Sequence, residues 1–236
     1  GVGVEEFEGG EGDNVYVYAR GDGNDTILDA NNFLISGKQN INTIKFVGLT
    51  SADIVDKVKE GNDLVIKLNG DPATPEKTSS VRVKNYFVSD QTKINYKIES
   101  FVFDDKPLTA IDIEKNISIY GTDNNDAIIG TNGNDTIHGG DGDDTINGEG
   151  GDDVIIAGKG NNEINGGTGK DTVVIDGKSK DYKFMDFNNK KYLFNQNTDT
   201  AKRFAGLLNV ENIKFKDKTV SADRTDAADI EMLKSI

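Results

Sequence analysis

The chain has 236 residues, a formal net charge of −14, no cysteine and no tryptophan. The missing cysteines exclude disulfide scaffolds, thiolate metal sites and cysteine nucleophiles. The acidic charge, with no basic run, argues against nucleic acid and anionic membranes as partners and favours cations. No stretch approaches the roughly 18 apolar residues of a membrane span, and the residues after Gly1 do not form a signal peptide. We therefore expect no transmembrane segment within these residues, and, because the chain does not begin with Met, we expect it to be a fragment of a longer protein.

The first 29 residues contain two glycine-rich acidic turns. The segment GGEGDNVYV covers residues 9–17, and ARGDGNDTILD covers residues 19–29. In both, glycine and aspartate precede alternating apolar residues, which is typical of a turn followed by a strand. Asp22 and Asp25 in the second turn are either cation ligands or plain polar turn residues.

Strands dominate the prediction for the next part of the chain. The segments NTIKFVGL, NDLVIKLNG, SVRVKNYFV and INYKIESFVF alternate apolar and polar residues, as do KYLF and NIKF further on. An amphipathic helical turn is expected from Thr50 to Lys59, capped by Thr50 or Ser51, and another from Ala227 to Lys234. The Asp71-Pro72 pair is expected in a hairpin loop.

From Gly121 to Val174 the chain repeats every nine residues. The units are GTDNNDAII, GTNGNDTIH, GGDGDDTIN, GEGGDDVII, AGKGNNEIN and GGTGKDTVV. The eighth position is always isoleucine or valine, and the sixth is aspartate in every unit except the fifth, which has Asn162. A flexible linker would not place a β-branched residue at every ninth position, so something must bury these residues.

Each unit reads as a six-residue turn followed by a short strand with one inward apolar side chain. Stacked units would form a two-sided coil with parallel strands and carboxylates aligned along its edges. The block holds eleven acidic residues against Lys159 and Lys170, a net charge of −9. Calcium, which accepts about six to eight oxygen ligands in flexible geometry, would offset this repulsion better than the stricter magnesium ion.

The block is similar to the GGxGxDxUx repeats of the RTX (repeats-in-toxin) family, and the resemblance covers all six units. It implies a parallel β-roll that holds calcium between turns separated by one repeat. The implied pairs are Asp126 with Asp144, Asp135 with Asp153, Asp144 with Asn162 and Asp153 with Asp171, or about four ions. Asn162 offers a neutral oxygen, so its pair should be the weakest. The glycines at the fourth position are implied as further ligands through their backbone: Gly133, Gly142, Gly151, Gly160 and Gly169. By the same resemblance, further ions could bind near residues 9–29.

A second repetition indicates that both halves of the chain have the same order of elements: glycine-aspartate turns, then β-hairpins, then a closing strand. IESFVFDDK at residues 98–106 is echoed by VENIKFKDK at residues 210–218. We expect an all-β protein in which a parallel β-roll carries antiparallel β-hairpin or sandwich caps. Residues 1–114 would form a first domain with few repeats, residues 115–222 the six-repeat roll and its cap, and residues 223–236 a short helical or flexible tail.

The sequence does not predict an enzyme. The one histidine, His138, has no nucleophile context, and the paired acids are explained by calcium. The RTX resemblance implies a protein of the Gram-negative cell surface or secreted through a type I channel, in which the module folds on extracellular calcium and supports a larger toxin, adhesin or surface-layer protein. The first alternative is a calcium-stabilised domain that itself binds a host protein, glycan or sister subunit, for example near Tyr86, Phe87 or Tyr192. A weaker one is a non-catalytic part of a secreted hydrolase.

Overall fold

The computed structural model describes residues 3–10, 12–29, 31–32, 41–70, 79–88, 94–95, 98–187, 190–196 and 203–222. It divides into two compact units, Gly1–Ile117 and Ser118–Ile236. Almost all regular structure in both units is β-strand, which confirms the predicted all-β class. The loop with Asp71-Pro72 and the tail that includes Ala227–Lys234 lie outside the described residues.

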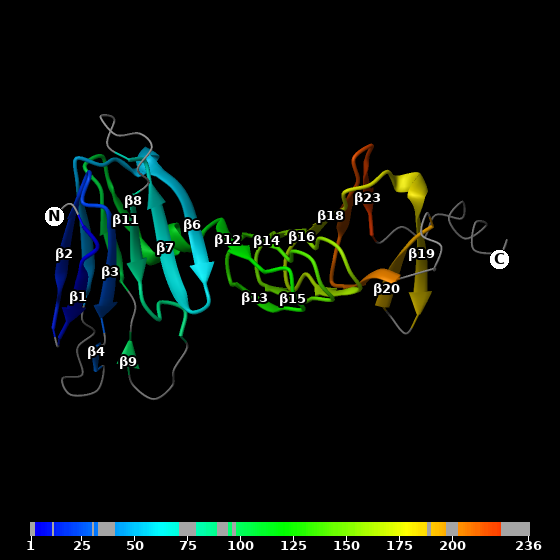
Figure 1. Ribbon diagram of the computed structural model, residues 1–236, viewed down its shortest axis with the longest axis horizontal. Coiled ribbons are helices and arrows are strands. Elements are labelled where there is room, and N and C mark those ends of the chain that lie inside the picture. Colours follow the sequence, from blue (N-terminus) through cyan, green and yellow to red (C-terminus); the bar gives the residue numbers. More distant parts are fainter. Residues whose placement is uncertain are drawn as a thin grey trace. The chain divides into compact units, whose positions relative to one another are not determined.

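The second unit is a two-sided coil whose successive turns alternate between two sheets (Figure 1). One sheet has the order β13-β15-β17-β21-β20-β19, and the other has the order β12-β14-β16-β18-β22-β23. The repeat strands are β13 (Ala127–Thr131), β14 (Asp135–His138), β15 (Thr145–Glu149), β16 (Val154–Ile156), β17 (Asn162–Asn165) and β18 (Thr172–Val174). The other strands are β12 (Ile117–Tyr120), β19 (Tyr182–Phe187), β20 (Lys190–Asn195), β21 (Arg203–Leu208), β22 (Asn212–Lys214) and β23 (Thr219–Ser221), with a 3₁₀ turn η2 at Ser179–Asp181.

The eighth-position residues form the core of this coil, as predicted. Parallel pairing aligns Ile128 with Ile146 and Ile146 with Ile164 in one sheet. In the other sheet Ile137 aligns with Ile155, and Ile155 with Val173. All six side chains are at most 7% exposed. The predicted parallel β-roll is therefore confirmed, with a thin apolar column inside it.

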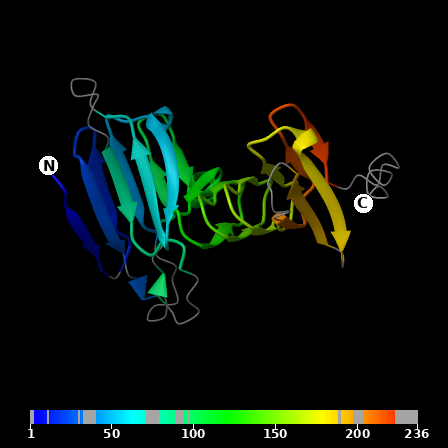
Figure 2. The ribbon, with the colours of Figure 1, turned by 45° about the vertical axis from the view of Figure 1, so that its right-hand side comes forward.

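The roll of the second unit ends in a cap of antiparallel strands. Strand β21 pairs in parallel with β17 and antiparallel with β20, which in turn pairs with β19 (Figure 2). In the other sheet β22 pairs in parallel with β18 and antiparallel with β23. Phe215, which follows β22, is 4% exposed and packs against Tyr182, so aromatic residues fill this cap.

The first unit also contains rows of parallel strands. One sheet has the order β1-β3-β8-β7-β6, a second has the order β11-β10-β5-β2, and β4 pairs with β9. Strands β1, β3 and β8 are parallel neighbours, as are β2, β5 and β10, whereas β6, β7 and β8 form an antiparallel meander. The strands are β1 (Glu6–Gly9), β2 (Val15–Ala19), β3 (Asn24–Asp29), β4 (Asn31–Asn32), β5 (Thr43–Val47), β6 (Ile54–Glu60), β7 (Asp63–Leu68), β8 (Ser79–Val83), β9 (Ile94–Asn95), β10 (Ser100–Val102) and β11 (Pro107–Thr109).

The predicted helical turn from Thr50 to Lys59 is wrong. Only a 3₁₀ turn forms there, η1 at Ser51–Asp53, and β6 follows it. Thr50 does cap this turn, through a capping box with Asp53. The β-branched residues Ile54, Val55 and Val58 suit a strand, and pairing with β7 takes precedence over local helix propensity. The one α-helix among the described residues, α1 (Ala110–Glu114), was not predicted.

Candidate metal centre

The sixth-position residues of the roll lie in two rows, because successive turns alternate between the two edges of the coil. We call the rows edge A and edge B. Each residue of a row lies eighteen positions after the one before it, apart from a final glutamate contributed by the closing strand. Edge A contains Asp126, Asp144 and Asn162, and edge B contains Asp135, Asp153, Asp171 and Glu211.

Each row is joined by hydrogen bonds from a backbone N–H to the next side chain. On edge A the Asp126 N–H donates to Asp144 Oδ1 over 3.0 Å, and the Asp144 N–H donates to Asn162 Oδ1 over 2.9 Å. On edge B the distances are 2.8 Å from Asp135 to Asp153 and 2.9 Å from Asp153 to Asp171. The structure thus brings together all four residue pairs expected from the sequence. One oxygen of each later residue is occupied by this bond.

The second oxygen of three of these aspartates is buried without a hydrogen-bond partner. The atoms are Oδ2 of Asp144, Asp153 and Asp171, and the three residues are at most 1% exposed. A buried carboxylate oxygen without a partner costs substantial free energy. Burial is the largest cause of the raised pKa of each of these carboxyls, with smaller contributions from neighbouring acids, and it raises the pKa of Asp153 to about 7. A cation beside these oxygens would remove both the desolvation cost and the mutual repulsion.

The first aspartate of each edge is different, because a threonine occupies its carboxylate. Asp126 Oδ2 accepts hydrogen bonds from the Thr122 N–H and from Thr122 Oγ1, at 2.6 and 2.9 Å. Asp135 accepts the same two donors from Thr131, at 2.6 and 3.0 Å. Both threonines stand at the second position of their repeats. The start of the roll therefore satisfies its acids with protein donors.

A second row of hydrogen bonds runs through the fifth positions in the opposite direction. Here a later N–H donates to an earlier side chain, from Asp143 to Asn125 Oδ1 and from Asp152 to Asn134 Oδ1, each over 2.8 Å. The Asn161 and Lys170 N–H groups donate in the same way to Oδ1 of Asp143 and Asp152, over 2.7 and 2.8 Å. The turns are therefore stacked by side-chain oxygens from both neighbours, which explains the recurring Asn and Asp at position five.

The backbone of the turns suits a calcium ion. Among the described residues, no three acidic or histidine side chains gather into a metal cluster, so backbone carbonyls would have to complete any coordination sphere. Glycines leave these carbonyls accessible: Gly160 has φ +118°, and a Cβ on it would overlap the Gly142 carbonyl oxygen of the turn eighteen residues earlier. Gly169 stands in the same relation to Gly151, with φ +135°. Carboxylate and carbonyl oxygens in a flexible turn are the donor set that calcium prefers.

Asn162 departs from the pattern together with its neighbour Ala157. In the repeats with aspartate at position six, position one is glycine, and a Cβ there would lie 3.0 Å or less from the aspartate Oδ2. The fifth repeat has Ala157 at position one, and Asn162 Nδ2 donates to its carbonyl over 3.4 Å. Edge A therefore ends in a neutral turn whose side-chain amide donates to its own backbone, and the weakest calcium binding at this last pair stays a prediction.

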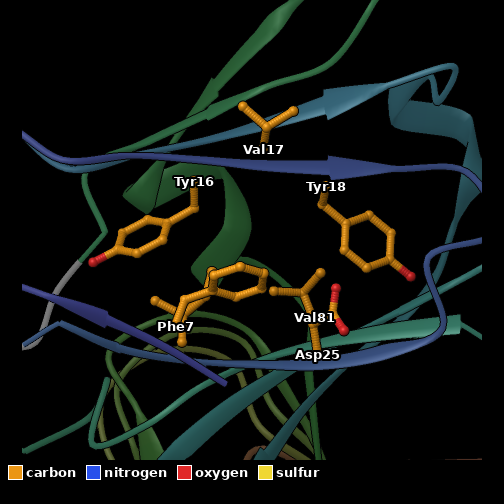
Figure 3. A pocket seen from close by; sticks show the side chains of 7 residues that line it. Phe7, Tyr16, Val17, Tyr18, Asp25 and Val81 are labelled. Atoms are coloured by element: carbon orange, nitrogen blue, oxygen red, sulfur yellow. The ribbon is translucent and has the colours of Figure 1, made fainter. Parts of the chain in front are cut away.

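In the first unit, Asp25 occupies a position like those of the roll. Its Oδ1 accepts the Glu5 N–H over 3.1 Å, and burial, with nearby acids, raises its pKa to about 6. Asp25 also lines a cavity of ≈ 20 Å³ together with Phe7, Tyr16, Val17, Tyr18, Ile27 and Val81 (Figure 3). Asp22 instead closes a local turn, since its Oδ2 accepts the Ala19 N–H over 2.7 Å. Calcium binding by Asp22 and Asp25 stays a prediction.

Sequence reasoning missed three residues that make the same kind of hydrogen bond, one at the end of edge B and two in a separate row of the first unit. Glu211 Oε2 accepts the Asp171 N–H over 2.7 Å, so it extends edge B beyond the repeats. In the first unit the Asn14 N–H donates to Asn42 Oδ1 over 3.1 Å, and the Asn42 N–H donates to Glu99 Oε2 over 2.7 Å. Two features of the sequence could have identified these residues. Asn42-Thr43-Ile44 matches the end of a repeat, and the similar segments at residues 98–106 and 210–218 share a glutamate at their second position.

Two further sequence predictions concern residues outside these rows. Tyr86 is 4% exposed and donates its hydroxyl to Glu114 over 2.9 Å, so it does not line an exposed groove. His138 stacks on Tyr120, with ring centroids 4.8 Å apart. Within the described part of the chain, no helix is both long and apolar enough to cross a membrane.

Comparison with known protein families agrees with this geometry. The model of the RTX calcium-binding nonapeptide repeat, which represents four copies, matches residues 120–155 and 147–174. No curated protein matches the chain. The matched residues include all six turns that form edges A and B up to Asp171. Residues 120–174 therefore belong to the RTX family of calcium-binding nonapeptide repeats.

Proposed function

We propose that the second unit is a calcium-dependent folding module, in which ions between stacked turns hold the roll together. The observation that carries this proposal is the set of three buried Oδ2 atoms without partners, on Asp144, Asp153 and Asp171. Calcium would bind between Asp126 and Asp144, between Asp135 and Asp153, between Asp153 and Asp171 and, most weakly, between Asp144 and Asn162. The fourth-position glycines would add carbonyl oxygens, and the first unit would add a further ion if Asp25 and Asp22 take part.

The energetic basis is linkage between binding and folding. The unfolded chain does not hold these oxygens together, so calcium binds the folded turns and its binding free energy stabilises them. Without the ion, like charges along each edge and three buried carboxylate oxygens oppose folding. Sites with a Kd of about 10⁻⁴ to 10⁻³ M would remain empty in a cytosol and fill outside the cell.

We further propose that this switch serves a larger secreted or cell-surface protein of a Gram-negative bacterium, a toxin, adhesin or surface-layer protein exported by a type I channel. A chain that stays unfolded at low calcium can pass a narrow channel and then fold outside. The net charge of −9 in the repeat block supports this, since it keeps the calcium-free block from collapsing. No described feature favours catalysis.

A far-ultraviolet circular dichroism titration of the full chain with calcium tests the folding switch, with magnesium as control and calorimetry to count bound ions. We expect a steep gain of β-structure with calcium, little with magnesium, and about four ions in the repeat block. A spectrum that does not change with calcium would contradict the proposal. Export would be tested separately, by comparing the longer protein with an Asp144→Ala/Asp153→Ala variant in the culture medium of a Gram-negative host.

A further inference from the structure

The strand that closes edge B is a repeat with a shortened turn. Ile213 aligns with Val173 in the parallel pair of β22 and β18, as one eighth-position residue aligns with the next. Three residues, Asn209–Val210–Glu211, lead into β22 where a full repeat would have six. Because this turn is shorter, the longer glutamate side chain does what aspartate does elsewhere: Glu211 Oε2 accepts the Asp171 N–H.

The surroundings of Gly166 match those of the earlier turns. A Cβ on Gly148 would contact both Asp153 Oδ2 and the Gly166 carbonyl oxygen of the next turn on that edge. In the same way, a Cβ on Gly166 would contact both Asp171 Oδ2, at 2.5 Å, and the Asn209 carbonyl oxygen. The Gly166 N–H donates to the Leu208 carbonyl over 3.0 Å, which fixes this register. Asn209 thus supplies its carbonyl where a first-position glycine would supply one.

Asp171 has a carboxylate oxygen without a hydrogen-bond partner beside Gly166 and the Asn209 carbonyl. The residue is 0% exposed, and its Oδ2 has no hydrogen-bond partner. Glu211 brings a second carboxylate beside Asp171, since its Oε2 accepts the Asp171 N–H over 2.7 Å. The carboxylates of Asp171 and Glu211 and the Asn209 carbonyl oxygen repel one another unless a cation lies among them.

We propose that Asp171, Glu211 and the Asn209 carbonyl form an additional calcium site, located between the last repeat and the closing strand. This inference rests on the proposed function, because it uses the same ion and the same edge. It places a ligand outside the nonapeptide repeats. Edge B then holds three ions, one after each of Asp135, Asp153 and Asp171, and its last ion fastens the roll to its cap.

The first unit contains a natural control. Its closing strand has the same register and the same hydrogen bond: Phe101 aligns with Ile44, and Glu99 Oε2 accepts the Asn42 N–H over 2.7 Å. The residue that precedes Glu99 in the row is Asn42, which is buried and neutral. Glu99 therefore has the structural role of Glu211 without a facing carboxylate, and we assign it no ion.

The test compares Glu211→Gln with Glu99→Gln in the full chain, by calorimetry with calcium chloride. Glutamine keeps an oxygen for the N–H, so both variants retain the row. We expect Glu211→Gln to bind one ion fewer, or to bind one ion at least tenfold more weakly, and Glu99→Gln to match the wild type. The inference is overturned if both variants keep the wild-type number and affinities. A wild-type chain that binds no calcium would instead overturn the proposed function.

Thermal unfolding separates metal binding from a purely structural role. In a calcium chelator, Glu211→Gln should be at least as stable as the wild type, because it removes a like charge beside Asp171. On adding calcium it should gain a smaller increase in Tm than the wild type. A variant that loses the same stability with and without calcium would show that Glu211 only supports the backbone, and would overturn the inference.

Discussion

The backbone N–H of Asp153 donates to Oδ1 of Asp171 over 2.9 Å, across eighteen residues of sequence. This contact occupies Oδ1 of the Asp171 carboxylate, and Oδ2 stays buried without a hydrogen-bond partner. The same division between a structural oxygen and a free one recurs at Asp144 and Asp153.

Asp144→Ala should weaken calcium-dependent folding more than Asp126→Ala. Asp144 is 1% exposed, accepts the Asp126 N–H and faces two proposed ions, whereas Asp126 faces one and already holds Thr122. Loss of the charge-assisted hydrogen bond alone should cost about 1.5–3 kcal/mol. The calcium midpoint from circular dichroism measures the difference, with Asp141→Ala, at an exposed residue that pairs with Lys159, as control. Equal midpoint shifts for the Asp144 and Asp126 variants would contradict the proposed ladder of ions.

Ile146→Asp should abolish the folded roll even at saturating calcium. Ile146 is 1% exposed and lies between Ile128 and Ile164 in the column, so the variant buries a charge without a partner. We expect a loss of more than about 4 kcal/mol. Ile129→Asp is the matched control, since Ile129 is 57% exposed, and it should change stability by about 0.5 kcal/mol or less. A normal circular dichroism spectrum for Ile146→Asp in calcium would refute the role of the column.

Acid should partly replace calcium. Burial raises the pKa of Asp153 to about 7 in the folded, calcium-free chain, above about 4 for an unfolded aspartate. A raised folded pKa contributes stability that is complete below the unfolded value and is lost as the pH rises through about 7. In chelator, the second unit should therefore be more folded at pH 5 than at pH 8, and calcium should bind less tightly at pH 5. Circular dichroism at the two pH values, with calorimetry, decides this; equal folding in chelator at both would count against it.

The double substitution Asn162→Asp/Ala157→Gly should strengthen the weakest pair of edge A. It restores a carboxylate at position six and the glycine that leaves room for its Oδ2. Calorimetry should show one calcium ion bound at least tenfold more tightly, and the calcium-free chain should be less stable. The single variant Asn162→Asp serves as control, because Ala157 would crowd the new carboxylate. No change in affinity for the double variant would show that Asn162 already ligates as well as aspartate.

The roll could be predicted because its period is strict. Isoleucine or valine at every ninth residue fixes both the inward side chain and the register, and the sixth-position acids follow at the turns. The closing strand β22 could not be predicted in the same way, because the turn that ends at Glu211 has three residues where a repeat has six, and the period is interrupted. The helical turn expected after Thr50 failed for another reason: pairing of β6 with β7 decides the structure there, and no local pattern contains that partner.

The sequence also could not predict which acids of an edge have their carboxylate satisfied by threonine and which keep an oxygen without a partner, because this depends on three-dimensional contacts. The sequence shows Asp126 and Asp144 as equivalent members of one template, yet only Asp126 has a threonine at position two to satisfy its carboxylate. Thr122 was visible as a departure from glycine, but its effect requires the hydroxyl to meet that oxygen. Asn42 was missed because the sequence before it retains little of the glycine pattern.

Because the turns of the roll alternate between edge A and edge B, it matters whether the number of repeats is even or odd. Removing one nonapeptide would move every later acid to the opposite edge, so that Glu211 would no longer face the row that it completes. Removing two would keep each remaining acid on its own edge. The roll can therefore gain or lose repeats in pairs, eighteen residues at a time. Only such a change keeps Glu211 of the closing segment on edge B.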